Sequence, residues 1–177
     1  MLFIKQRDDL CQPITANHGL LRPEEPKNCY TAHQNIFRLM KIEIKRLDDA
    51  FHLQAINESG LTLESDGAES IGGHNLAMRP MQMLLSSLGS CSAIDVILLL
   101  RKQRQQLDDI QLTITAEREK DKSPSLFTDI HVHYKLFGPL DEKKVKRAVD
   151  LSMEKLCSVK LILEKTARIT WSWEVLG

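Results

Sequence analysis

The sequence has few cysteines and no net charge, and both shortages exclude whole classes of protein. Its 177 residues contain four cysteines, none at the short spacings of a disulfide framework or a metal-binding motif. Lysine plus arginine and aspartate plus glutamate balance at 24 each, so we expect neither nucleic acid nor an anionic membrane as a partner. The N-terminus lacks the charged-then-apolar layout of a secretory signal. We therefore expect a cytoplasmic protein in which each thiol serves packing or chemistry.

Residues 1–39 lack the periodic hydrophobicity that marks helices and strands. Prolines and asparagines interrupt short apolar stretches there, and no period of 2 or 3.6 residues persists. We predict a poorly ordered N-terminal extension over 1–39, with Met40 as the natural start, followed by one domain over 40–177. Cys11 and Cys29 fall in the extension without a neighbour at ligand spacing, and we interpret them as incidental.

The longest apolar run is Met81–Leu100, and Cys91 stands near its middle among small residues. Pro80 precedes the run, and proline suits the first position of a helix. We predict a long core helix with a face that another backbone can approach closely. The run is long enough to span a bilayer, but Gln82, four serines and Asp95 argue against a membrane helix.

Hydrophobic alternation of period two predicts strands on both sides of this helix. Three strands precede it as an antiparallel meander, two follow it, and a closing strand ends the chain. Between the last two strands, apolar residues at three- and four-residue steps predict a helix that runs through Cys157, followed by a short helix or turn to Leu163. The resulting order, βββ-α-ββ-α-α-β, indicates the α+β class. The strands are expected at Met40–Leu47, 51–55, 61–63, 110–116, 130–136 and 169–175.

Three histidines are weaker candidates for a site. His74 lies in the glycine-rich loop 65–79, which either folds over a site or serves as a plain crossover. His131 and His133 share one exposed strand face, but they lack a third ligand and are expected to be surface residues. We expect no metal and no other cofactor.

Cys91 and Cys157 both fall on predicted core-facing helices, 66 residues apart. Only the fold could bring them together. A buried cysteine commonly packs as a small hydrophobe, whereas a pair of exposed thiols is a candidate for redox chemistry. Spacing alone leaves both interpretations open.

Longer stretches of the sequence resemble the OsmC/Ohr family and, within it, the YhfA-like branch. The stretches are KIEIKRLDDAFHLQAINESG, RPMQMLLSSLGSCSAIDV, SMEKLCSV and LEKTARITWSWEV, and together they cover Met40 to about Val175. The resemblance implies an OsmC-like fold with antiparallel sheets around a long buried central helix. It also implies an intertwined homodimer whose central helices lie back to back, with the thiol site at the subunit interface.

The same resemblance implies a thiol-dependent peroxidase that reduces organic hydroperoxides in oxidative stress defence. Cys91 would attack the peroxide as thiolate and become a sulfenic acid, and Cys157 would resolve it as a disulfide. A small dithiol such as dihydrolipoamide would then reduce the disulfide. Two alternatives remain open: a dimer that binds a small molecule without turnover, and a structural dimer with buried cysteines.

The family also places a glutamate and an arginine beside the attacking thiol, where they hold the thiolate and polarise the leaving oxygen. Met81 stands at the glutamate position in this sequence, and its neighbour Gln82 is the substitute at hand; neither carries a charge. The arginine position falls near Ile71, whereas the nearest arginine is Arg79, just before the helix. We retain Arg79 and Gln82 as secondary catalytic candidates.

Overall fold

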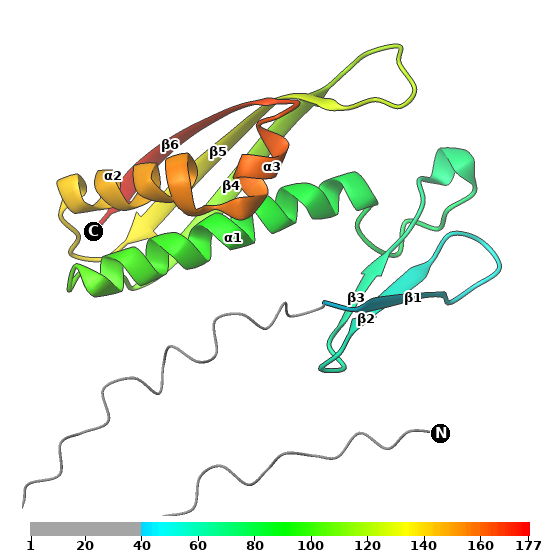
Figure 1. Cartoon of the computed structure of the whole chain (residues 1–177), viewed down its shortest axis with the longest axis horizontal. Helices are drawn as coiled ribbons and strands as arrows, with labels where there is room; N and C mark the ends of the chain where they lie inside the picture. The colour runs from blue at the N-terminus through cyan, green and yellow to red at the C-terminus, as the bar shows by residue number, and fades with distance from the viewer. Residues whose placement is uncertain (1–39) are drawn as a thin grey trace, which may run out of the picture. The chain divides into compact units, whose positions relative to one another are not determined.

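The computed structural model describes residues 40–177 (Figure 1). The predicted extension over 1–39 lies outside the described residues. The predicted element order is confirmed, with two additional short helical turns, η1 and η2. In chain order the elements are β1 (Ile42–Arg46), β2 (Leu53–Asn57), β3 (Thr62–Ser65), η1 (Glu69–Ile71), α1 (Pro80–Lys102), β4 (Asp109–Arg118), β5 (Phe127–Phe137), α2 (Glu142–Leu151), η2 (Ser152–Leu156), α3 (Ser158–Leu163) and β6 (Arg168–Leu176).

The first sheet is the predicted antiparallel meander, in the order β1-β2-β3. Ala55 of β2 pairs with Ile44 on one side and with Leu63 on the other, so the three lie in one cross-strand row. We expected β1 to be half-buried, but Ile42 and Ile44 are 58% and 66% exposed in the single chain. The alternation is therefore present, while no described segment of the same chain covers its apolar side.

The second sheet has the order β4-β5-β6, and it corrects the prediction of purely antiparallel sheets. β4 and β5 pair antiparallel, but β5 and β6 pair parallel, from Asp129 opposite Arg168 to Phe137 opposite Leu176. The physical reason is the connection: α2, η2 and α3 carry the chain back along the sheet, so β6 starts at the same end as β5.

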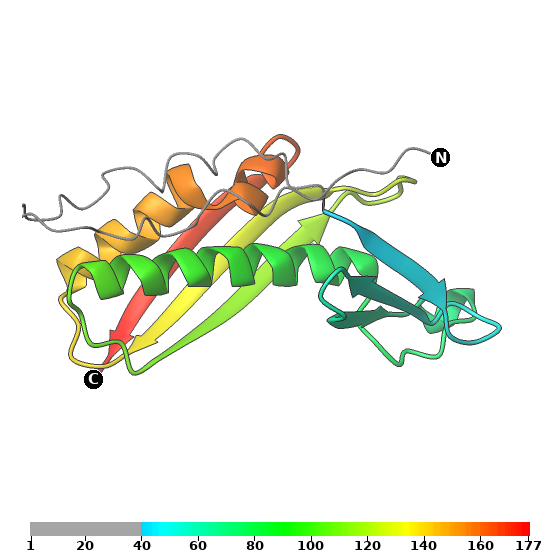
Figure 2. The ribbon, with the colours of Figure 1, turned by 60° about the horizontal axis from the view of Figure 1, so that its bottom comes forward.

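The core lies between this sheet and the helices on one of its faces. α1 packs on β4 and α2 packs on β6 (Figure 2). Alternate side chains of β5 point into the core, whereas His131, His133 and Lys135 lie on the opposite face. Fully buried side chains include Leu88, Val96 and Leu100 of α1, Ile130, Val132, Tyr134 and Leu136 of β5, and Val145, Ala148 and Val149 of α2.

Helix α1 begins at Pro80, as the sequence predicts. The Gln82 side-chain oxygen accepts a hydrogen bond from the Arg79 backbone N–H at 2.9 Å, which closes the first turn. By length and composition α1 could cross a membrane, with a mean hydropathy of 2.0 over 18 residues. Core helices of soluble proteins share these properties, and α1 packs on β4, α2 and α3.

The predicted helix through Cys157 is wrong at its C-terminal end. α2 stops at Leu151, and η2 is a π-helical turn, in which the Cys157 N–H donates to the Ser152 carbonyl five residues back at 2.9 Å. A π turn holds one residue more than an α turn, so it rotates the following side chains away from the α-helical stripe. Leu156 is consequently 44% exposed, and Cys157 has extended backbone angles at the N-cap of α3.

Candidate thiol site

Two cysteines and one carboxylate meet between α1 and the start of α3. The Sγ atoms of Cys91 and Cys157 and a carboxylate oxygen of Asp95 all lie within 4.8 Å of one another. Cys91 and Asp95 share a face of α1 because four residues make about one helical turn. Cys157 is fully buried, whereas Cys91 and Asp95 are half-buried. The fold therefore brings together two thiols 66 residues apart, one of them within reach of solvent.

A serine of the π turn fixes the carboxylate of this cluster. The hydroxyl of Ser152 is fully buried and donates to Asp95 Oδ2 at 3.2 Å, with the Ser92 carbonyl oxygen 3.4 Å away as a second acceptor. The Cys157 Sγ lies 4.0 Å from the Leu88 carbonyl oxygen of α1. Ser152 and Cys157, at the two ends of the η2 turn, thus both make polar contacts with α1.

The small residues around Cys91 let a neighbouring strand come close. A Cβ added at Gly89 would lie 2.7 Å from Cδ1 of Ile114 on β4. Part of the small-residue face therefore packs on the chain's own sheet. Ser86, Ser87 and Ser90 are exposed.

Burial raises the pKa of the Cys157 thiol from 9.0 to about 11. The backbone N–H of Lys160 opposes this rise, while the neighbouring Cys91 and Asp95 add to it because each carries or gains negative charge. At neutral pH Cys157 is consequently a protonated thiol. The Lys160 ammonium pairs with Glu164, the residue that caps the C-terminal end of α3.

The phenol of Tyr134 lies beneath the cluster. Its side chain is fully buried, and burial, together with the charges of Cys157, Asp95 and Cys91, raises its pKa to about 12. The nearby Ser92 hydroxyl offsets part of the rise in the Tyr134 pKa, while its own proton is donated to the Gly89 carbonyl at 3.1 Å. Among the described residues, the Tyr134 hydroxyl is the one buried side-chain polar atom without a hydrogen-bond partner.

The secondary candidates Arg79 and Gln82 lie far from the thiols of their own chain. An α-helix rises about 1.5 Å per residue, so Arg79 is about 18 Å and Gln82 about 14 Å along α1 from Cys91. Gln82 is exposed and occupied by capping. Within residues 40–177, no ion pair includes Asp95. Residues 40–177 of one chain therefore supply no paired cation to Asp95.

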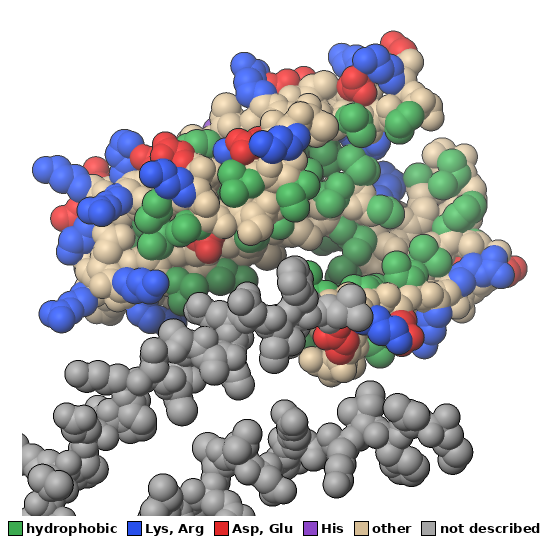
Figure 3. All heavy atoms as spheres, viewed as in Figure 1, with side chains coloured by type: hydrophobic (Ala, Val, Ile, Leu, Met, Phe, Trp, Pro, Cys, Tyr) green, Lys and Arg blue, Asp and Glu red, His purple; other side chains and the backbone are tan. Residues whose placement is uncertain are grey.

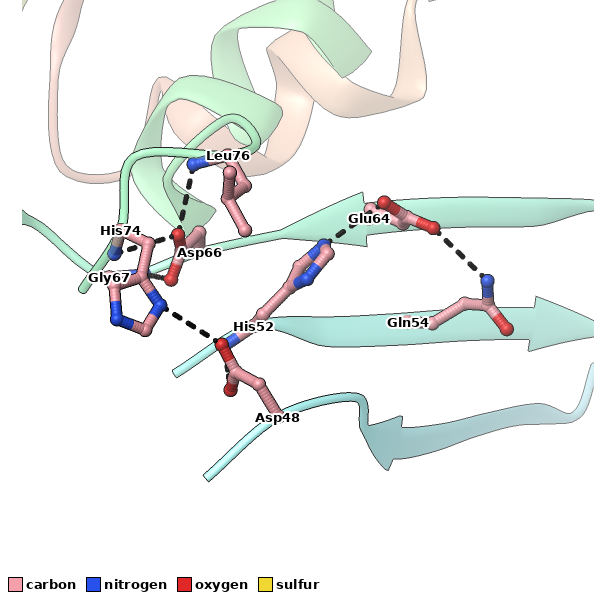
Figure 4. A network of polar contacts seen from close by, with 8 residues as sticks. All are labelled: Asp48, His52, Gln54, Glu64, Asp66, Gly67, His74 and Leu76. Carbon is pink, nitrogen blue, oxygen red and sulfur yellow. Dashed lines mark hydrogen bonds and ion pairs between the residues drawn. The ribbon is translucent and has the colours of Figure 1, made fainter. Parts of the chain in front are cut away.

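His74 is held at the first sheet rather than over the thiols. Its ring Nδ1 lies 3.2 Å from Asp48 Oδ2 (Figure 4). Next to it, the buried Asp66 carboxylate accepts backbone hydrogen bonds from Leu76, Gly67 and His74, which hold its pKa below the usual range. The loop 65–79 thus folds on its own carboxylate, and this arrangement favours the plain crossover.

His131 and His133 form a polar ladder with β6. The His131 ring lies 2.8 Å from the hydroxyls of Thr170 and Ser172, and His133 lies 2.8 Å from Ser172 and 3.2 Å from Glu174. These contacts join the two parallel strands on the face away from α1. They agree with a role as surface residues.

Asp95 is a site residue that the sequence pattern did not predict. We used this carboxylate only as an argument against a membrane helix, although its spacing of four residues from Cys91 places both on one helix face. That spacing could have indicated Asp95 as a neighbour of the Cys91 thiol. It could not predict the approach of Cys157, which depends on the π turn.

Comparison with known proteins identifies the fold that holds this site. A family model described as OsmC-like protein matches residues 73–172, more than half of the chain. The chain belongs to the OsmC-like family. Protein YhfA of Escherichia coli strain K12 is 45% identical over 119 residues, which cover 62% of this chain and 88% of YhfA.

Solved structures of other proteins share this fold. A hypothetical protein from Aquifex aeolicus VF5 is 30% identical, with a TM-score of 0.64 over 78% of this chain and 98% of that one. A protein from Legionella pneumophila, named as an organic hydroperoxide resistance protein OsmC, has a TM-score of 0.61 over 79% and 99% of the two chains. Its identity is 15%, so this likeness concerns the fold alone.

Proposed function

We propose that this OsmC-like protein is a thiol-dependent peroxidase that reduces organic hydroperoxides. The observation that carries the proposal is the meeting of two free thiols, Cys91 and Cys157, from separate segments of the fold. The name of the Legionella pneumophila protein, an organic hydroperoxide resistance protein of the same fold, agrees with it.

The different exposure of the two thiols supports their division of labour. Cys91 is half-buried and accessible to a peroxide, so it is the attacking residue. Cys157 is fully buried and protonated at neutral pH, which suits a thiol that reacts only after Cys91 has been oxidised. Once Cys91 is a sulfenic acid, Cys157 is already placed beside the sulfur that it must reach.

The reaction balances in three steps. The Cys91 thiolate attacks the outer peroxide oxygen, an S–O bond forms, the O–O bond breaks, and the leaving alkoxide takes a proton to become an alcohol. The Cys157 sulfur then attacks the Cys91 sulfenic acid, forming the S–S bond and releasing water. An external dithiol, for which dihydrolipoamide is our candidate, exchanges with the disulfide and restores both thiols while it becomes oxidised itself. We assign this cycle to the cytoplasm, where a reducing poise keeps both thiols available.

A homodimer would cover the apolar surface that residues 40–177 leave exposed. Large apolar side chains remain exposed on β1, β3, α1 and α3, and Figure 3 shows hydrophobic side chains gathered on this face. A groove of about 440 Å³ on the first sheet is lined mainly by apolar residues of β1, β2 and β3, with Met83 of α1. Large exposed apolar patches are uncommon on monomeric proteins and commonly mark sites of protein–protein contact. The exposed residues are Ile42, Ile44, Leu61, Leu63, Leu84, Ile94, Leu98 and Ile162.

In such a dimer, a basic residue from the partner could stand beside Cys91, although Arg79 of the same chain cannot. Light scattering of the pure protein tests the assembly: we expect a mass about twice the 20.2 kDa of one chain. A mass of one chain would contradict the dimer.

The peroxidase itself is tested by one equivalent of cumene hydroperoxide added to the reduced, metal-free protein. We expect a Cys91–Cys157 disulfide by peptide mass spectrometry and turnover with dihydrolipoamide. Cys91→Ser should abolish peroxide consumption, and Cys157→Ser should stop at the sulfenic acid. The control carries Cys11→Ser and Cys29→Ser together and should react as the original chain does.

A second function, binding of a small apolar or electrophilic molecule without turnover, is favoured by Met81 at the family's glutamate position. The same experiment separates the two functions. If Cys91 remains a thiol under excess hydroperoxide, the peroxidase is wrong. A small molecule that copurifies with that unreactive protein would then support the binding function.

A further inference from the structure

The thiol site has the composition of a metal centre as well as that of a redox pair. It offers two sulfur atoms and one carboxylate oxygen within 4.8 Å of one another. In a tetrahedral zinc site the metal lies about 2.3 Å from sulfur and about 2.0–2.2 Å from carboxylate oxygen, so ligand atoms of one site are separated by less than twice these lengths. Small side-chain rotations of Cys91 and Asp95, both half-buried, would close the cluster around one ion.

The charges of the cluster call for a cation. Two thiols and a carboxylate can carry three negative charges, and no ion pair of the described residues reaches Asp95. Cys157 has no exposed surface, so its thiolate is costly unless a positive charge compensates it. A divalent ion supplies that compensation and displaces the two thiol protons.

The surroundings already resemble the outer shell of a metal site. Ser152, fully buried, donates to Asp95 Oδ2 and leaves the other carboxylate oxygen free for an ion. The fully buried hydroxyl of Tyr134 lacks a hydrogen-bond partner among the described residues, and it lies close enough to Cys91, Asp95 and Cys157 for their charges to act on it. A buried polar group without a partner in a native fold requires an explanation, and a species bound at the neighbouring cluster would provide one.

We propose that reduced protein binds one Zn²⁺ ion through Cys91, Cys157 and Asp95, with solvent as the fourth ligand. Two thiolates select a thiophilic ion over Mg²⁺ or Ca²⁺, which prefer oxygen. Binding converts two thiols into two metal-bound thiolates and releases two protons per ion. The bound ion also shields the Cys91 sulfur from hydroperoxide, and oxidation to the disulfide removes two of the three ligands. The site therefore holds zinc only in its reduced state.

Cobalt(II) is the probe for this site, because it substitutes for zinc and gives colour. Reduced full-length protein with Cys11→Ser and Cys29→Ser is titrated with Co²⁺ without oxygen or peroxide. We expect a thiolate-to-cobalt charge-transfer band and tetrahedral visible bands that saturate at one ion per chain. Added Zn²⁺ should bleach both sets of bands, and two protons per zinc should be released in a weakly buffered solution.

Variants assign the three ligands. Cys91→Ser and Cys157→Ser should each lose most of the charge-transfer band. Asp95→Asn should keep the band but weaken zinc binding. The weakening should exceed that of Ser152→Ala, for which the loss of the hydrogen bond to Asp95 predicts about tenfold. Asp49→Asn is the matched control: Asp49 is exposed and outside the cluster, so its affinity for zinc should be unchanged.

The metal proposal fails if no charge-transfer band forms at one equivalent of Co²⁺, or if Cys157→Ser binds as tightly as the parent. It also fails in its ligand set if Asp95→Asn and Asp49→Asn bind alike. These outcomes are independent of the peroxidase, since the titration contains no peroxide and the peroxidase test contains no metal. A joint arm then measures oxidation of Cys91 by cumene hydroperoxide with and without saturating Zn²⁺, and equal rates would contradict shielding of the sulfur.

Discussion

The buried position of Cys157 predicts that closure of the disulfide is strongly dependent on pH. Sulfenic acids react with thiolates, and the Cys157 thiol has a pKa of about 11. Its thiolate fraction is therefore roughly one in ten thousand at pH 7 and roughly one in a hundred at pH 9. Burial is the largest cause of the raised pKa, so most of the rise persists after Cys91 has been oxidised and has lost its own charge. We expect closure to accelerate about a hundredfold between pH 7 and pH 9.

The assay separates this step from the attack on the peroxide. Reduced, metal-free protein is mixed with enough cumene hydroperoxide to oxidise Cys91 rapidly, and the surviving sulfenic acid is trapped with dimedone at timed intervals. Mass spectrometry then counts the trapped and the disulfide-linked peptides. The Cys157→Ser variant should keep its sulfenic acid at every pH, which shows that the measured decay belongs to closure.

If the closure rate is the same at pH 7 and pH 9, the reasoning is refuted. Cys157 would then react through a thiolate that is already formed at neutral pH. Such a result would require a positive charge close to its sulfur, and the described residues of one chain do not provide one. The partner subunit would be the place to search for it.

Three further predictions concern stability. Between pH 9 and pH 11 the unfolding free energy should fall by about 2 kcal/mol. The cause is that the Cys157 thiol loses its proton near pH 9 in the unfolded chain but keeps it to about pH 11 in the folded protein. Urea titrations should show that Cys157→Ala reduces this dependence of stability on pH. Gly73→Ala should lower the unfolding free energy by about 2 kcal/mol or more, since the added Cβ would lie 2.2 Å from the Gly67 carbonyl oxygen. Gly177→Ala is the control: no atom lies within 4 Å of its added Cβ, so the same assay should show no measurable loss of stability. Asp141→Ala should lower the melting temperature and cost about 1 kcal/mol, because the Asp141 side chain caps α2 by accepting from the N–H groups of Lys143 and Lys144; an unchanged melting temperature would contradict this role.

Regular periodicity explains why most of the fold could be predicted from the sequence. Alternation located the strands, and Pro80 marked the start of α1. The parallel pairing of β6 with β5 could not be predicted in this way, because alternation defines the faces of a strand but not its direction. The exposure of Ile42 and Ile44 could not be predicted for a similar reason. Alternation identifies the apolar side of a strand but not the segment that covers it.

The site was less predictable than the fold for a local reason. The sequence placed Cys157 on the stripe of a continuous helix, but the π turn at Ser152–Leu156 takes it to the N-cap of α3. Resemblance to a known family paired Cys157 with Cys91, and geometry places both within reach of Asp95. Asp95 was not predicted as part of the site, because a carboxylate inside an apolar run indicates first that the helix does not cross a membrane.

The separation of the two thiols along the chain also couples oxidation to resistance against unfolding. A Cys91–Cys157 bond would tie α1 to the η2–α3 junction and close a covalent ring that encloses β4, β5 and α2. Loop-entropy arguments give such a ring of 66 residues about 4 kcal/mol of added stability, all of it through the unfolded chain. The disulfide form of the protein would therefore resist heat and proteases better than the reduced form. A reductant would have to overcome that same stabilisation to restart the cycle.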